Sequence, residues 1–394
     1  MDNLQKKFTD IQENEVSTKS VIFDLENRDD QGSLKKLLDE GYIKHVGDDY
    51  IEQLKELFAV QNPILVYKPD FGEKFNIFLK ETQVRKNLLL HGKWVFYPWL
   101  SALVHILDEE DFFLVRTARN RYLISPEEQD IFYNSVVGIG GLSVGNSVAL
   151  AIVLQGGAKH IKLADFDKLA LSNINRVRAG VQNLGVPKVE VTARQIYEIN
   201  PYSIVEIFDQ GLNAENIREF FKDLDIVVDE LDNIAIKYLI REQAKKHKLP
   251  LVMAADNGDN AVVDVERYDL NPQPEFFQGR LGKVSFEQLK SLDKFRIGQT
   301  ITKHIGPENI TERMQQSLLE MGKTIVSWPQ LGGAALLNGS AVAYCVRKIL
   351  NNESIESNRA LVSLDEKLIP NYNSPEEIKK RREISDNFKQ MFNL

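Results

Sequence analysis

The chain is poor in the side chains that form disulfides and bind zinc. It contains one cysteine, Cys345, and its six histidines are scattered without the spacing of metal ligands. A lone cysteine excludes a disulfide within the chain and a zinc site built on cysteines. Disulfide-stabilised scaffolds and cysteine-based zinc proteins are therefore not among the classes to which this sequence can belong.

The sequence also lacks an excess of positive charge and long apolar runs. Its 394 residues include 49 Lys and Arg against 57 Asp and Glu, which gives a net charge of −8. That balance argues against broad nucleic-acid or anionic-membrane binding and leaves room only for a local basic patch. No uncharged apolar run approaches a membrane span, and the N-terminus lacks a signal peptide's apolar stretch. We expect a cytoplasmic protein of two or three domains, with neither nucleic acid nor membrane as a partner.

The first 115 residues carry no motif that identifies a function. Residues 1–15 are polar and are expected to be loose. Apolar spacing predicts helices at 33–38 and 50–58 and short strands at 64–67 and 94–97. The four aromatic side chains between Trp94 and Trp99 are interpreted as core or an interdomain contact rather than a binding surface. We assign residues 1–115 to an N-terminal α+β domain of unknown role.

From residue 116 onward, apolar strands alternate with amphipathic helices. Strands are predicted at 135–139, 161–164, 204–208, 226–228 and 251–254, and helices at 142–154, 187–199, 214–222 and 234–247. This alternation is typical of an α/β protein with a doubly wound, mainly parallel, Rossmann-like sheet, in which ligands bind beyond the carboxyl ends of the strands. After about residue 270 only helices are predicted, at 309–321, 336–350 and 375–392, the last as a peripheral arm. We assign 116–350 to the α/β domain and 351–394 to a C-terminal helical tail.

A glycine turn follows the first predicted strand of the α/β domain. The segment reads Val137-Gly138-Ile139-Gly140-Gly141-Leu142-Ser143. Gly138 and Gly140 permit a tight strand-to-helix turn and close approach of the backbone to phosphate, which the N–H groups of the next helix would face. The dinucleotide fingerprint has a third glycine where this chain has Ser143. The turn predicts a nucleotide site, with a glycine turn used only for packing as the alternative.

Two aspartates follow the second predicted strand. Asp165 and Asp167 flank Phe166, and a carboxylate at this place can accept hydrogen bonds from ribose hydroxyls. Dehydrogenases also place an acid at the end of a second strand, so this pair alone does not separate them from other nucleotide-binding proteins. A loop aspartate that caps a turn is the alternative.

A polar loop then takes the place of a quick strand-to-helix connection. It contains Ser172-Asn173-Ile174-Asn175-Arg176. Lys188 lies further on, in the first turn of the next helix, which is an unfavourable place for a cation unless an anion is near. An arginine and a lysine converging on a triphosphate would explain both residues. The alternative is a solvated basic loop.

Carboxylates follow the fourth predicted strand. The segment reads Val227-Val228-Asp229-Glu230-Leu231-Asp232-Asn233. Acidic side chains at this edge are placed to hold Mg²⁺, a hard cation that prefers oxygen ligands alongside phosphate. Asp232 or Asn233 can also cap the following helix, and the two roles are compatible.

In this order the motifs resemble the ThiF/MoeB family, whose fold is shared with ubiquitin-activating enzymes. The resemblance covers roughly residues 116–270. The segments at 141–145 and 175–180 look like a bacterial branch in which a nitroreductase-like domain is sometimes fused, and no such domain is recognised in this sequence. The resemblance implies binding of ATP and Mg²⁺ and adenylation of a carboxylate, usually the C-terminus of a peptide or a small ubiquitin-like protein.

The resemblance also implies a role for each motif residue. Nucleotide contacts fall on Gly138, Gly140, Gly141, Asp165, Asp167, Asn173, Asn175, Arg176 and Lys188. Within this set Asp165 takes the ribose, while Asn173, Arg176 and Lys188 take phosphates; Asp232 takes Mg²⁺. Family members often form homodimers in which an arginine reaches the partner's ATP, a position that Arg121 occupies here, with Arg119 as an alternative. Arg176, Lys188 and Arg121 are the expected catalytic residues.

The chain departs from the family pattern in its cysteines. Many relatives carry two cysteine pairs for zinc, which are absent, and ubiquitin-activating relatives use a cysteine nucleophile. Cys345 lies in an apolar helical segment, and we interpret it as a buried core residue. Thioester transfer is therefore not expected. Lys237 stands where relatives often have arginine, and the pair Gly332-Gly333 is interpreted as a packing feature rather than part of an acceptor channel.

Two other functions stay open at the level of sequence. An NAD-dependent oxidoreductase would use the same glycine turn but would leave the loop between Asp165 and Lys188 without a purpose. A non-catalytic nucleotide-binding scaffold would bind ATP without releasing pyrophosphate.

Overall fold

The computed structural model describes residues 17–271 and 275–394, so the predicted loose segment 1–15 lies outside the described residues. The chain divides into two compact units. Unit 1 contains Met1–Ser125 and Tyr197–Tyr202, and unit 2 contains Pro126–Ile196 and Ser203–Leu394. The domain boundaries at 115 and 350 remain proposals from the sequence. Among the described helices, none combines the length and apolarity needed to cross a membrane.

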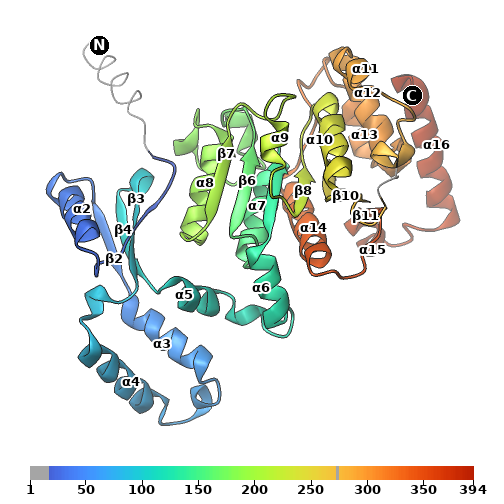
Figure 1. The fold of residues 1–394 in the computed structure, drawn as a ribbon. Helices are drawn as coiled ribbons and strands as arrows, with labels where there is room; N and C mark the ends of the chain where they lie inside the picture. The colour runs from blue at the N-terminus through green and yellow to red at the C-terminus, as the bar shows by residue number, and fades with distance from the viewer. Residues whose placement is uncertain (1–16, 272–274) are drawn as a thin grey trace. The chain divides into compact units, whose positions relative to one another are not determined.

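Unit 1 is built on a four-stranded sheet with helices (Figure 1). Its elements are β1 (Val21–Phe23), α2 (Arg28–Asp39), β2 (His45–Asp48), α3 (Tyr50–Gln61), α4 (Phe71–Arg85), β3 (Lys93–Tyr97), β4 (Ala102–Ile106) and α5 (Glu109–Arg116). The strand order is β1-β3-β4-β2, with β2 and β4 parallel and the other pairs antiparallel. The predicted helices and the strand at 94–97 are confirmed.

The aromatic segment of β3 belongs to the core of unit 1. Trp94, Phe96 and Tyr97 are each less than a tenth exposed, which confirms their interpretation as core. The strand predicted at 64–67 is wrong, because this segment forms a 3₁₀ turn at Leu65–Tyr67. Tyr67 is almost fully exposed there, so the apolar run has no sheet face to bury.

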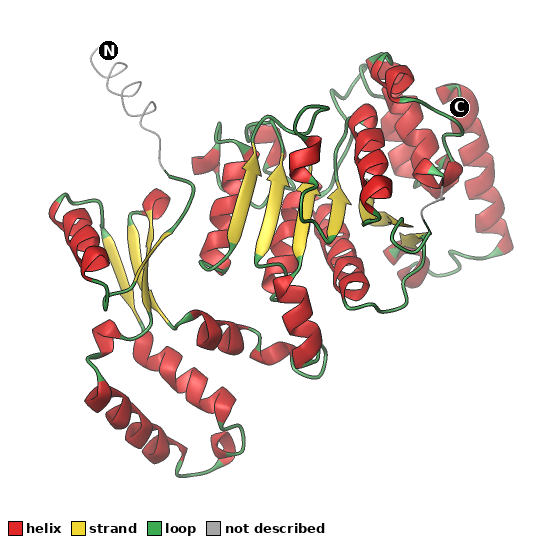
Figure 2. Cartoon of the chain, viewed as in Figure 1, coloured by secondary structure: helices red, strands yellow, loops and turns green. Residues whose placement is uncertain are grey.

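Unit 2 contains a seven-stranded sheet (Figure 2). The strands are β5 (Val136–Gly140), β6 (His160–Ala164), β7 (Ile204–Phe208), β8 (Ile226–Asp229), β9 (Pro250–Asn257), β10 (Asn260–Arg267) and β11 (Asn358–Val362). Their order is β11-β10-β9-β8-β5-β6-β7. The five strands from β9 to β7 in this order run parallel to one another, and β10 is antiparallel to both of its neighbours, β9 and β11. The chain order reverses between β5 and β8, which defines a doubly wound sheet and confirms the predicted fold class.

Helices cover both faces of this sheet. They are α6 (Pro126–Asn134), α7 (Val144–Leu154), α8 (Lys188–Ile199), α9 (Ile217–Phe220), α10 (Ile234–His247), α11 (Phe286–Lys290), α12 (Lys294–Ile305), α13 (Glu312–Leu319), α14 (Gly332–Leu350), α15 (Leu364–Leu368) and α16 (Pro375–Phe392). Side chains of α9 and α10 share one core cluster with Val227 and Leu251 of the sheet. On α7, Asn146 donates to Thr192 of α8 at 3.0 Å, and Gly339 of α14 lies so close to Ser147 that a Cβ would approach its backbone to 2.7 Å.

The C-terminal part of the chain differs from the prediction in its strands, in the unpredicted helices α11, α12 and α15, and in the packing of α16. Strands β10 and β11 were not predicted, although both belong to the main sheet. Helix α16 has the predicted bounds, but it is not a peripheral arm, since Phe388 and Phe392 are buried against Met314 and Leu318 of α13. Although the composition of α16 is charged, the helix has one apolar edge, and this edge is enough to pack it against α13.

Candidate functional site

A cavity of about 570 Å³ lies in unit 2, at the carboxyl ends of the parallel strands. Its walls come from the turn after β5, the ends of β6, β8 and β9, the start of α8, and residues of α12 and the segment 327–330. This is the edge at which a doubly wound sheet binds its ligands, and the volume suits a small molecule.

The turn after β5 forms because a glycine occupies its tightest point. Gly141 has φ +84°, and a Cβ there would collide with the carbonyl oxygen of Glu230. Gly140 and Gly138 do not line the cavity. A Cβ on Gly138 would lie 2.7 Å from Leu224, so this glycine serves close packing of the sheet against its helices.

Asp165 fixes the loop beyond β6. Its Oδ2 accepts the Leu142 N–H at 2.7 Å and its Oδ1 accepts the Asp167 N–H at 2.8 Å, which ties the end of β6 to the turn after β5. Burial raises the pKa of Asp165, although Lys188 and these two N–H groups act in the opposite direction. The second lone pairs of the carboxylate remain available to a ribose hydroxyl.

Lys188, the first residue of α8, is buried and already has anionic partners. Its Nζ lies 2.7 Å from Oδ2 of Asp167 and 3.9 Å from Oδ2 of Asp165. These carboxylates account for a cation in the first turn of a helix without a phosphate. Neither sequence interpretation, a bare phosphate ligand or a solvated basic loop, describes this arrangement.

Arg176 reaches the glycine turn from the polar loop. Its Nε donates to Oγ of Ser143 at 2.7 Å, and its Nη1 donates to Oδ1 of Asn175 at 2.9 Å. Burial lowers the pKa of the guanidinium, with Asp256 acting in the opposite direction. Arg176 therefore lies beside the first turn of α7, where helix N–H groups and a side-chain cation can act on the same anion.

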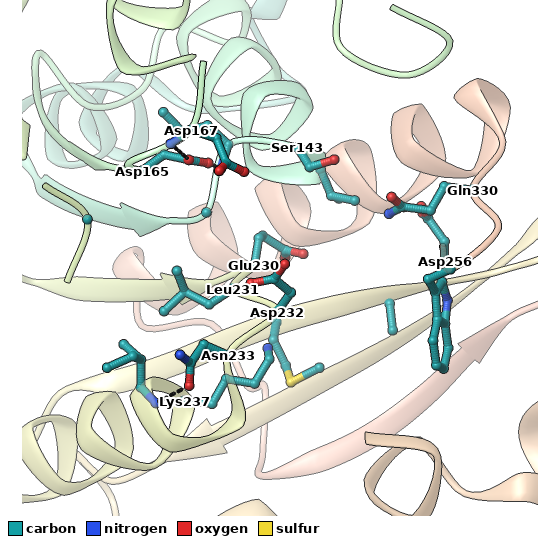
Figure 3. Close-up of a pocket in the computed structure, with 18 of the residues that line it drawn as sticks. Ser143, Asp165, Asp167, Glu230, Leu231, Asp232, Asn233, Lys237, Asp256 and Gln330 are labelled. Carbon is teal, nitrogen blue, oxygen red and sulfur yellow. Dashed lines mark hydrogen bonds between the residues drawn. The ribbon is translucent and has the colours of Figure 1, made fainter. Parts of the chain in front are cut away.

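The opposite side of the cavity is acidic (Figure 3). Glu230 follows β8, and its Oε1 accepts the Ala254 N–H at 3.0 Å. Strand β8 pairs with β9 only as far as Val252, so the carboxylate takes an N–H that the ladder leaves unpaired. Burial raises the pKa of Glu230 well above its usual range, against the nearby Lys237.

A buried ion cluster lies beneath Glu230. Asp229 is fully buried and contacts Nζ of Lys237 at 3.2 Å and Nη1 of Arg241 at 2.6 Å. Arg241, also fully buried, reaches Glu266 at 2.7 Å. Although burial alone would raise it, the pKa of Asp229 is held below its usual range by Lys237 and Arg241. Asp229 therefore balances the positive charge of Lys237, and no ligand in the cavity is needed to do so.

Asp256, His304 and Gln330 also line the cavity, and they come from distant parts of the chain. Asp256 at the end of β9 accepts from Nε2 of Gln330 at 2.9 Å and from Nδ2 of Asn338. His304 of α12 is almost fully buried, and its Nδ1 has no hydrogen-bond partner among the described residues. Burial, followed by Arg241, lowers the pKa of His304 well below its usual range. The sequence analysis assigned no role to these residues, since nothing in their local sequence marks them.

The structure brings together most of the predicted site residues. The cavity is lined by Gly141, Asp165, Asp167, Asn173, Arg176, Lys188 and Asp232. Asn175 lies next to it, donating through Nδ2 to the carbonyl of Gln330 at 2.8 Å. Arg121 and Arg119 belong to unit 1, and their role at a partner's nucleotide stays a prediction.

The segment after β8 was predicted to hold a metal through Asp232 and to cap the next helix through Asp232 or Asn233. Asn233 caps α10, because its Oδ1 accepts the N–H groups of Ala235 and Ile236. Asp232 is exposed at the cavity wall. In residues 17–271 and 275–394, no three His, Cys, Asp or Glu side chains are grouped to hold a metal. A single carboxylate fits Mg²⁺ only in company with phosphate oxygens and water.

Fold and cavity together define a nucleotide-binding α/β domain. Residues 119–273 match the family model described as "ThiF family", so the chain contains a ThiF-family domain. An uncharacterised protein of Mycobacterium tuberculosis is 37% identical over 272 residues, 69% of this chain and 38% of that protein. Molybdopterin-synthase adenylyltransferase of Haemophilus influenzae is 34% identical over 137 residues, 34% of this chain and 55% of that enzyme. The chain thus spans about half, or less, of the length of these relatives.

Among solved structures, that of Escherichia coli MccB with ATP has a TM-score of 0.46 at 19% identity. The superposition covers 66% of this chain and 77% of that one. A likeness of this size supports no conclusion about the ligand of this chain.

Proposed function

We propose that this protein is an ATP-dependent adenylyltransferase that activates a carboxylate as an acyl-adenylate and releases pyrophosphate. The observation that carries the proposal is one cavity lined by Asp165, Arg176 and Lys188 at the strand-order reversal of a ThiF-family domain. A relative that shares this region is named an adenylyltransferase, which supports the same chemistry.

In the proposed reaction, a carboxylate oxygen of the substrate attacks the α-phosphorus of ATP and pyrophosphate leaves. The protein positions the two reactants and stabilises negative charge on the phosphates. Arg176 and the N–H groups at the start of α7 hold the phosphates, and Asp165 accepts from the ribose. Bound Mg²⁺ would neutralise phosphate charge, with Asp232 as its protein ligand.

Lys188 can serve the phosphates only by exchanging partners. Its Nζ lies 2.7 Å from Asp167, so a phosphate must replace or share that carboxylate. We propose that ATP binding makes this exchange, which keeps the buried ammonium paired in both states.

We further propose a homodimer in which Arg121 reaches the partner's ATP, and a peptide or ubiquitin-like C-terminus as the carboxylate substrate. Residues 1–115 are the part of the chain proposed to recognise that substrate, because no motif of the α/β domain is assigned to the carboxylate.

The test compares ATP–Mg²⁺ with NAD as stabilising ligands of the full chain in thermal unfolding. A ligand at a hundred times its Kd stabilises the folded state by about 2.7 kcal/mol. We expect ATP–Mg²⁺ to raise the Tm and NAD to leave it unchanged. Stabilisation by NAD alone would indicate that the protein is an oxidoreductase rather than an adenylyltransferase. A nucleotide-binding scaffold would show the ATP effect yet release no pyrophosphate with any peptide acid supplied.

A further inference from the structure

The cavity has two side-chain acceptor atoms that receive no hydrogen bond from the described residues. Glu230 uses Oε1 to accept the Ala254 N–H, and its Oε2 has no hydrogen-bond partner in the part of the chain that the structure describes. His304 also lines the cavity. Its Nε2 lies 3.3 Å from Sδ of Met253 and 3.6 Å from Oδ2 of Asp264, both acceptors. The ring proton therefore belongs on Nε2, and Nδ1 is left as an unpartnered, buried acceptor.

The side chains of Glu230 and His304 contact neighbouring residues of one strand. Met253 contacts His304, and Ala254 donates to Glu230, so β9 holds both groups at the same end of the cavity. The remaining wall here is largely apolar, formed by Ile301 and Ile305 of α12 and by Trp328. His304 and these three apolar side chains lie outside the residues that match the family model, which end at 273.

Glu230 also lies beside the proposed phosphate site. A Cβ on Gly145, in the first turn of α7, would be 3.6 Å from Cβ of Glu230. A carboxylate and a phosphate that lie close together repel one another unless a cation lies near both. Lys237 does not fill this role, since Asp229 already pairs with it at 3.2 Å.

We propose that this end of the cavity binds the primary ammonium group of an acyl acceptor, between Glu230 and His304. The inference rests on the proposed adenylation and names the class of compound that receives the acyl group. A primary ammonium offers three N–H donors, which complement a carboxylate and a bare imidazole nitrogen. Hydrated Mg²⁺ fits this place less well, because it keeps several waters and the surrounding wall is apolar.

The transfer step balances without a further reagent. The ammonium gives one proton to Glu230, and the amine nitrogen forms a bond to the carbonyl carbon of the acyl-adenylate. The bond from that carbon to the phosphate oxygen breaks, AMP leaves with its electron pair, and the departing phosphate takes the second proton that the nitrogen gives up. The product is an amide, and no cysteine is needed, in keeping with the position of Cys345 in α14, outside the cavity.

The experiment uses two AMP analogues whose 5′ group is a sulfamate with either an aminopropyl or a butyl tail. The tails have the same length and differ by a terminal ammonium against a methyl. Calorimetry on the full chain measures both affinities for the wild type, for Glu230→Gln and for Glu242→Gln. The glutamine at 230 can still accept from Ala254, and Glu242 is an exposed acid on α10 that serves as the matched control.

We expect the wild type and Glu242→Gln to bind the aminopropyl analogue about tenfold more tightly, the size of a charge-assisted hydrogen bond. In Glu230→Gln the preference should fall to about onefold while the butyl analogue binds as before. Equal affinities in the wild type, or a preference that survives Glu230→Gln, would overturn the amine site. If millimolar Mg²⁺ abolished the preference, the amine site would also be overturned, and Glu230 would be a ligand of the metal instead. Failure of AMP itself to bind would reject the proposed adenylation instead.

Discussion

The two sides of the cavity are built in different ways. On the side of β5 and β6, the glycine turn, Asp165 and Arg176 lie within forty residues of one another and hold each other by direct hydrogen bonds. On the side of β8 and β9, Glu230 and His304 come from separate elements and rest on a buried ion cluster. The first side can hold an anion as it stands, whereas the second depends on packing in the whole of unit 2.

The electrostatic design of the two sides differs as well. On the first side, Lys188 pairs with Asp167 and lies near Asp165, and Arg176 supplies a second positive charge. On the second side, Arg241 neutralises the residues below Glu230 and leaves Glu230 itself without a cation. The comparison supports the proposal that the first side holds the nucleotide and that the second holds a positively charged ligand.

The largest effect on the free energy of unfolding is expected from a substitution in the ion cluster beneath Glu230. Arg241→Met removes the cation that pairs with Asp229 and Glu266, which leaves the buried Glu266 without a cation and Asp229 with Lys237 alone. Breaking a buried pair in this way costs about 3–5 kcal/mol. Urea unfolding followed by circular dichroism should show that loss. Arg218→Met, the same change at an exposed site of α9, should leave the unfolding free energy within about 0.5 kcal/mol. Equal stability of the two variants would mean that the cluster does not support the cavity.

The next effect separates nucleotide binding from stability. Arg176→Ala removes the guanidinium beside Ser143 and should weaken ATP–Mg²⁺ binding by roughly 10- to 100-fold, the value of a charge-assisted contact. The ATP-dependent rise in Tm measures this loss. Arg178→Ala is the matched control, because Arg178 is exposed in the same loop and does not line the main cavity. If both variants lost ATP equally, the loop would act through its total charge and Arg176 would have no specific role.

The same comparison explains what the sequence could predict. Asp165, Asn173 and Arg176 fall in one stretch of chain between elements with strong periodicity, so their meeting at a sheet edge follows from the order of strands and helices. His304 and Asp256 meet the cavity only because α12 and the end of β9 pack there. The carboxylate partners of Lys188 were not predicted for a related reason: a helix start predicts that a lysine needs an anion, but not which one. Its contact with phosphate stays a prediction.

The missed strands have a physical reason too. Strand β10 is buried along its whole length and includes Asp264, Glu266 and Arg267, which break the apolar pattern of a buried strand. Arg359 pairs with Asp264 and Arg241 with Glu266, so partners far along the chain make these charges tolerable. No window around 260–267 contains that information.

A smaller effect tests the charge state of Glu230. Its pKa is raised in the folded protein by burial, so between the usual pKa of about 4.3 and the raised value the folded state binds more protons than the unfolded state. Stability then falls as pH rises through this window. Glu230→Gln cannot lose a proton, so its stability relative to the wild type should grow from pH 4.5 to pH 8, by an amount on the order of 1 kcal/mol. Urea midpoints measured across this range check it, and a difference that stays flat would mean that Glu230 is fully solvated.

The smallest effect concerns Cys345, which belongs to neither side of the cavity. Burial raises the pKa of its thiol to about 11, so the reactive thiolate is scarce at neutral pH. Cys345→Ala should leave ATP-dependent stabilisation and pyrophosphate release unchanged within about twofold and cost roughly 1 kcal/mol of stability through lost packing. Iodoacetamide at pH 8 should modify the wild type only in denaturant, as judged by intact mass. Modification of the folded protein, coupled to loss of pyrophosphate release, would place a nucleophilic thiol in the reaction, and the acyl group would then pass through the enzyme rather than directly to an amine.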